Sequence, residues 1–210
     1  SELVEFALAK QGIPVEKLER TWLDTRNYES YRLVVIVGDL TRARMTPSGY
    51  SEEDIDRLRS FLSRGGTLLI MQRGRQAFDT IAGRLALKKI VGENTSRVVV
   101  SMRHRLPDHS WVKHLNSKLP HPWIATANAV PMRMSQGEAI IGSDDGGRAT
   151  LLRTQVGKGQ LVYVGWEMSA FLKREEQPAT VDDERIFQEQ LQLLEKIVAS
   201  AYPAEQQAAK

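Results

Sequence analysis

Residues 31–76 read YRLVVIVGDLTRARMTPSGYSEEDIDRLRSFLSRGGTLLIMQRGRQ, and this stretch decides the fold. Two continuous apolar runs, residues 33–37 and 67–71, flank an amphipathic segment over residues 51–64 that is closed by a Gly-Gly pair. Continuous apolar runs of this length are typical of strands covered on both faces, as in parallel sheets whose strands are joined by helices. The stretch therefore predicts a strand, a helix and a second, parallel strand of an α/β sheet.

The remaining sequence extends this pattern. We expect helices over residues 2–11, 76–87, 108–116 and 183–201, and strands over residues 15–22, 97–102, 123–127, 138–142, 149–155 and 160–166. The turn Gly157-Lys158-Gly159 between two apolar runs predicts a β-hairpin rather than a phosphate loop, because no helix follows it. The sequence thus predicts one α/β domain over residues 1–202 and a flexible tail over residues 203–210. Its expected architecture is three-layer and flavodoxin-like, with a mostly parallel central sheet, helices on both faces and an antiparallel hairpin at one edge.

The chain opens with a helical pattern, whereas a doubly wound unit normally opens with a strand. We therefore expect the first strand to lie upstream, in a longer protein of which this domain is a part.

Composition excludes several function classes. The 210 residues are 41% hydrophobic and 26% charged, as in ordinary globular domains, and no apolar run approaches the roughly 18 to 20 residues that span a bilayer. The absence of cysteine excludes disulfides, thiolate metal sites and cysteine catalysis. The net charge of +3 comes from 29 basic and 26 acidic residues without a basic cluster, which argues against nucleic acid as a partner. Composition leaves the cellular compartment open.

Polar side chains follow the two strands of the opening stretch. In open α/β sheets, ligands bind where strands end, and neighbouring parallel strands end at the same edge. Arginine forks there suit a carboxylate, a phosphate or an acidic partner surface. The alternative is a solvated loop edge on which the arginines pair with Asp39, Glu52 and Glu53. The candidate ligand-binding residues after the two strands are Asp39, Arg42, Arg44, Gln72, Arg73 and Arg75.

Two further groups of residues are weaker candidates. The four histidines, His104, His109, His114 and His121, have spacings of five, five and seven, which match no compact zinc pattern, so we expect no metal site. Trp111, Trp123 and Trp166 are compatible with a sugar-stacking platform, but we expect them to pack in the core.

Three segments resemble the class I glutamine amidotransferase-like superfamily. They are residues 27–38 (NYESYRLVVIVG), residues 58–71 (LRSFLSRGGTLLIM) and residues 156–165 (VGKGQLVYVG). The chain is most similar to the branches that are not amidotransferases, such as ThuA-like domains and the trimerisation-type domains attached to sugar-processing enzymes. The resemblance implies the flavodoxin-like fold described above.

The catalytic members of that superfamily carry a Gly-x-Cys-x-Gly nucleophile elbow after the second strand. The matching run here is Ile70-Met71-Gln72-Arg73-Gly74, so a glutamine occupies the nucleophile position. A carboxamide cannot attack a carbonyl as a thiolate does. Of the late His-x-Glu pair, only Glu167 matches, and Gly165 stands in place of the histidine. The resemblance thus adds Glu167 to the candidate ligand-binding residues and implies no amidase chemistry.

These observations predict a pseudoenzyme: a domain without catalytic residues or cofactors that serves as an interaction, assembly or ligand-binding module of a larger protein. Its expected partners are other domains or proteins and an anionic or sugar ligand, with no membrane contact. The alternative is a hydrolase-like enzyme of the same superfamily that uses non-standard residues on a small polar or sugar-derived substrate.

Overall fold

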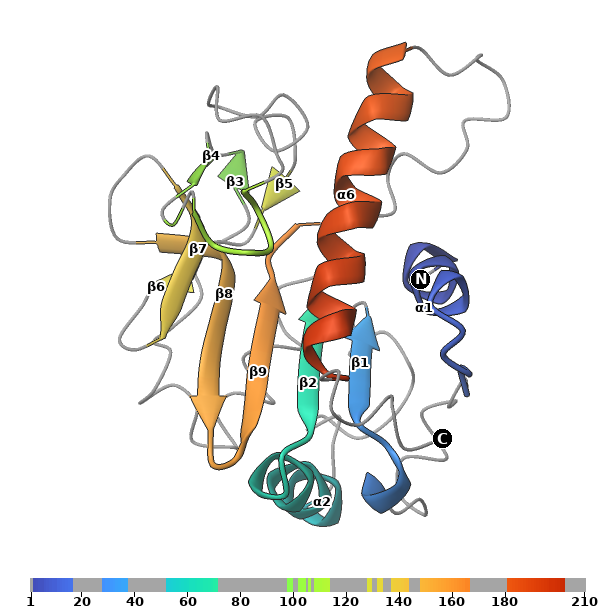
Figure 1. Cartoon of the computed structure of the whole chain (residues 1–210). Coiled ribbons are helices and arrows are strands. Elements are labelled where there is room, and N and C mark those ends of the chain that lie inside the picture. Colours follow the sequence, from blue (N-terminus) through green and yellow to red (C-terminus); the bar gives the residue numbers. More distant parts are fainter. Residues whose placement is uncertain are drawn as a thin grey trace, which may run out of the picture.

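The fold was analysed in a computed structural model of the chain. The structure describes residues 2–16, 28–37, 52–71, 98–99, 102–104, 106, 108–113, 128–129, 132–133, 137–143, 148–166 and 181–202. These residues form an α/β structure around one mixed sheet (Figure 1). None of the described helices is both long and apolar enough to span a membrane.

The central sheet has the strand order β1-β2-β9-β8-β7-β4, and β6 pairs with β8 beside this path. The strands are β1 (Leu33–Val37), β2 (Thr67–Met71), β4 (Met102–His104), β6 (Met132–Arg133), β7 (Glu138–Ser143), β8 (Arg148–Val156) and β9 (Gly159–Val164). A separate two-stranded sheet joins β3 (Val98–Val99) to β5 (Asn128–Ala129). The predicted strand over residues 97–102 is therefore divided between β3 and β4, which belong to different sheets.

The sheet is mixed, so the expectation of a mostly parallel sheet with a hairpin at one edge is wrong in its proportions. β1, β2 and β9 are parallel, as the opening stretch predicts, whereas the pairs β9–β8, β8–β7 and β7–β4 are antiparallel. The hairpin β8–β9 lies in the middle of the sheet, because β9 joins β2 while β8 continues into β7. The pairs β7–β8 and β8–β9 are antiparallel because their connections are short, whereas parallel neighbours need a crossover of a dozen or more residues.

One face of the sheet packs against α1 (Glu2–Lys10) and α6 (Val181–Ser200). Leu69, Val162 and Val164 project from the strands into a core with Leu194 and Ile197 of α6. An ion pair of 2.7 Å between Lys10 Nζ and Glu195 Oε1 joins the two helices at the surface. The final helix, predicted from residue 183 to 201, packs on the sheet through its C-terminal half, and its N-terminal half extends beyond β1 and β2 (Figure 1).

The other face packs against α2 (Glu52–Ser63) and the short 3-10 helix η2 (Tyr28–Ser30). Leu58, Phe61 and Leu62 form the apolar stripe that the sequence predicts, and they lie in a second buried cluster with Leu68 and Leu161 of the sheet. Neighbouring residues of one strand therefore enter opposite cores, which explains why β2 and β9 are mostly apolar and are buried throughout.

Several other sequence predictions can be compared with the described residues. The first helix ends as predicted, with Gly12 in the left-handed region at φ 68°. The short helix expected near residue 108 is replaced by turns over residues 108–113. The strand predicted to begin at residue 15 is not formed over residues 13–16. Most of that segment, the helix over residues 76–87, the strand over residues 123–127 and the tail from residue 203 lie outside the described residues.

The tightest contact in the sheet lies where β9 begins. A Cβ atom added to Gly159 would lie 2.2 Å from the carbonyl oxygen of Gly66 and 2.5 Å from that of Leu62. Gly66 also accepts a hydrogen bond of 3.1 Å from the amide of Gln160. Because both obstructing atoms belong to the backbone, only glycine fits at position 159.

We predict that Gly159→Ala lowers the free energy of unfolding by about 3 kcal/mol, because the methyl group forces β9 away from the α2–β2 turn. Gly12→Ala is the matched control, since Gly12 has positive φ but no atom within 4 Å of an added Cβ. It should cost about 1 kcal/mol from backbone strain alone. Denaturant unfolding of the two variants checks this, and equal losses would contradict the close contact.

Candidate functional site

The ligand-binding residues proposed from the sequence follow strands whose ends the structure describes. Val37, Met71 and Val164, the last residues of β1, β2 and β9, are register partners, so three parallel strands end at one edge. The prediction that the first two strands are parallel is confirmed, and the structure shows that they are also neighbours. The candidate side chains themselves lie outside the described residues, and their clustering stays a prediction: Asp39, Arg42, Arg44, Gln72, Arg73, Arg75 and Glu167.

A cavity of about 620 Å³ opens at the opposite edge of the sheet, where the same three strands begin. Leu33, Thr67 and Gln160 are aligned across the strands, so the residues just before them meet at this edge. Four parts of the chain contribute: the entry to β1, the α2–β2 turn, the β8–β9 hairpin and the end of α6. The polar side chains that line the cavity are Tyr28, Ser30, Tyr31, Arg32, Arg64, Thr67, Arg153, Gln155, Lys158, Gln160 and Ser200.

The lining of this cavity is basic. It contains the side chains of Arg32, Arg64, Arg153 and Lys158, and no aspartate or glutamate among the described residues. The Arg153 guanidinium lies 3.7 Å from the Glu138 carboxylate, which compensates part of its charge from outside the cavity. Within the described part of the chain, neither Arg32 nor Lys158 has a carboxylate partner.

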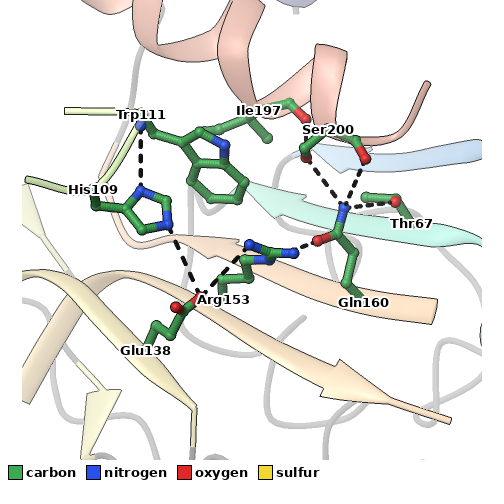
Figure 2. A network of polar contacts seen from close by, with 8 residues as sticks. All are labelled: Thr67, His109, Trp111, Glu138, Arg153, Gln160, Ile197 and Ser200. Carbon is green, nitrogen blue, oxygen red and sulfur yellow. Dashed lines mark hydrogen bonds and ion pairs between the residues drawn. The ribbon is translucent and has the colours of Figure 1, made fainter. Parts of the chain in front are cut away.

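A buried amide forms the floor of the cavity (Figure 2). Gln160 Oε1 accepts a hydrogen bond of 2.8 Å from Arg153 Nε, and its Nε2 donates to Thr67 Oγ1 at 3.0 Å and to Ser200 Oγ at 3.1 Å. The Ser200 hydroxyl in turn donates to the carbonyl of Ile197 at 2.6 Å. These bonds fix the amide orientation and connect β8, β9, β2 and α6.

A second polar group adjoins Arg153, on the side of β7 (Figure 2). His109 Nδ1 accepts a hydrogen bond of 3.3 Å from the backbone amide of Trp111, and its Nε2 lies 3.9 Å from Glu138 Oε2. The His109 and Trp111 rings meet edge to face at 5.0 Å, and the Arg153 guanidinium carbon lies 5.6 Å from the Trp111 ring centre. These contacts pack the surface of the sheet beside the cavity.

Burial is the main influence on the pKa of His109 and lowers it below 6.5, with Glu138 opposing the shift and Arg153 adding to it. Within the described ranges, no three His, Asp or Glu side chains are placed to hold a metal ion. His114 and His121 lie outside those ranges.

The sequence left open whether the tryptophans form a sugar-stacking platform or pack in the core. Trp111 and Trp166 are 3% and 1% exposed and belong to the core beneath α6, so the expectation of core packing is confirmed for both. Trp123 lies outside the described residues.

Sequence reasoning missed the basic cavity because its charged side chains come from segments far apart in the chain. A signal was present, since Arg32 and Lys158 stand immediately before strands and Arg64 precedes the Gly-Gly pair. Residues that precede parallel neighbours meet at the amino edge, just as residues that follow them meet at the carboxyl edge. Using this signal required knowing that the third parallel strand is β9, which the hairpin pattern alone does not reveal.

Solved structures show this fold in two settings. The cytoplasmic protein STM1381 from Salmonella typhimurium LT2 is similar over 93% of this chain and 86% of its own, with a TM-score of 0.60 and 14% identity. The beta-galactosidase from Bacillus circulans sp. alkalophilus is similar over 99% of this chain but 27% of its own, with a TM-score of 0.53 and 15% identity. An exo-beta-1,4-mannosidase from Opitutaceae bacterium strain TAV5 is similar over 94% of this chain and 30% of its own, with a TM-score of 0.52 and 13% identity.

The TM-scores show a shared α/β fold. At identities this low, the similarity says nothing about activity. No protein-family model and no curated protein matches the sequence. The fold therefore occurs both as most of a chain and as less than a third of a long glycosidase.

We predict that His109 makes stability depend on pH. Because its folded pKa lies below 6.5, the unfolded chain takes up the proton first as pH falls. The free energy of unfolding should therefore decrease from pH 7.5 to pH 5.5 more steeply in the parent than in His109→Gln. Denaturant titrations at both pH values check this, with Lys113→Gln as an exposed control that should keep the parent slope. Identical slopes in the parent and His109→Gln would contradict it.

Proposed function

We propose that this chain is a non-catalytic binding domain of the class I glutamine amidotransferase-like type, with a flavodoxin-like three-layer arrangement. It serves as a module of a larger protein and holds a small polar ligand in the basic cavity at the amino edge of β1, β2 and β9. The proposal keeps the binding role that the sequence indicates. It places the binding site in the described cavity, at the edge of the sheet opposite to the one expected from the sequence.

The observation that carries the proposal is the chemistry of the cavity lining. It offers many groups that bind, including arginine forks, a lysine, hydroxyls and a buried amide. Among its described residues it has no carboxylate or histidine to act as a general base. Two of its hydroxyls are also engaged, since Ser200 donates to Ile197 and Tyr31 donates to Glu16. Such a lining supports binding rather than bond cleavage.

The size of the cavity agrees with this role. Small-molecule sites are clefts of about 300 to 1,000 Å³, and about 620 Å³ lies within that range. The solved glycosidases support the module reading, because in them the matched fold is about a quarter to a third of a longer chain. A hydrolase that uses Gln72 and Glu167 is the competing function, and the test below separates the two.

We expect the purified chain to bind ligands from a library of sugars, carboxylates, phosphates and nucleotides and to hydrolyse none of them. A ligand at a hundredfold its Kd stabilises the native state by about 2.7 kcal/mol, which raises the Tm by about 5 to 10 °C for a chain of this size. Thermal shift measures the binding, and release of nitrophenol from ester and glycoside substrates measures hydrolysis. Turnover that Glu167→Gln abolishes would overturn the proposal in favour of the hydrolase.

A further inference from the structure

The charge of the basic cavity exceeds what the described residues of the protein balance. α2 and α6 both end at the cavity, where Arg64 and Gly65 follow α2 and Ser200 and Ala201 line the wall. The carboxyl end of a helix acts as roughly half a negative charge, so the two ends together supply about one. Arg32 and Lys158 together carry two positive charges, which exceeds this one negative charge. The comparison leaves out Arg153, which pairs with Glu138, and Arg64.

The backbone fixes the points from which these two cationic side chains extend. The carbonyl of Arg32 accepts a hydrogen bond of 2.8 Å from the amide of Thr67, which joins the entry of β1 to β2. Lys158 lies in the two-residue turn between β8 and β9, and its carbonyl would be 3.8 Å from a Cβ on Gly65. Both side chains therefore extend from strand ends whose positions are fixed by the register of the sheet. Both are exposed and accessible to a ligand.

The floor adds neutral polar groups to this charge. Gln160 is 7% exposed and Thr67 is 2% exposed, so their hydrogen bonds to each other and to Ser200 are shielded from water. This network therefore makes a rigid base beneath the exposed cations, which are left to contact the ligand.

On the basis of the proposed function, we propose that the cavity selects a small ligand through its phosphate or carboxylate groups, with Arg32 and Lys158 as the residues that recognise the charge. Arg32 presents a fork that pairs two anionic oxygens, and Lys158 contributes a mobile point charge. The chemistry shared by sugar phosphates and polycarboxylates meets these requirements, whereas a neutral sugar leaves the cations unmatched.

Titration calorimetry with pyrophosphate and with citrate, at 50 mM and 300 mM salt, tests the inference and separates the two anion types. At least one should bind, and its affinity should fall at the higher salt concentration because these cations are exposed. Arg32→Gln and Lys158→Gln should each weaken binding about tenfold, the effect of one lost charge-assisted hydrogen bond. Lys113→Gln removes the same charge from an exposed lysine outside the lining and should bind as the parent does.

Unchanged thermal unfolding of the variants without ligand shows that they are folded. Equal anion affinity in the parent and in the double variant Arg32→Gln/Lys158→Gln would overturn the inference. Binding of neutral sugars without either anion would also overturn it, yet would leave the proposed binding function standing. Hydrolysis that depends on Glu167 would instead refute the proposed function, whichever anion binds.

Discussion

The close approach of two backbones, at Gly66 and Gly159, is the constraint on which the rest of the described structure depends. The carbonyls of Gly66 and Leu62 occupy the space where any other residue at position 159 would place its Cβ. This contact sets β9 against the end of α2, and the hydrogen bond from Gln160 to Gly66 fixes the register. From that point, five consecutive residue pairs align β2 with β9.

The same contact accounts for the position of the cavity. With β9 in register, Gln160 lies beside Thr67 and below Ser200, so one amide satisfies partners from two strands and a helix. The hairpin turn then places Lys158 beside the α2–β2 turn, close to Arg64. The packing at these two glycines thereby determines how charged side chains from four parts of the chain are arranged around the cavity.

The sequence predicted those features whose causes are local. The helix over residues 52–63, its glycine end, the strand pair β1–β2 and the β8–β9 hairpin each follow from periodicity and turn residues. The position of β9 within the mixed sheet could not be predicted in this way. Its pairing with β2 joins residues 93 positions apart and depends on shape rather than on a sequence pattern. The basic cavity was not predicted for the same reason, since its lining also comes from distant segments. The family resemblance directed attention to the carboxyl edge, where Gln72 and its neighbours lie outside the described residues.

The separation of the partners in sequence has a consequence for the order of assembly. The pairs β7–β8 and β8–β9 join residues within about 20 positions of each other, so we expect this meander to cost little loop-closure entropy and to form early. Docking of β9 onto β2 and closure by the end of α6 span 93 and 40 residues and must follow. The polar floor therefore depends on contacts between distant segments that the native fold brings together, and the ligand that we propose there would bind the native state and not the unfolded chain.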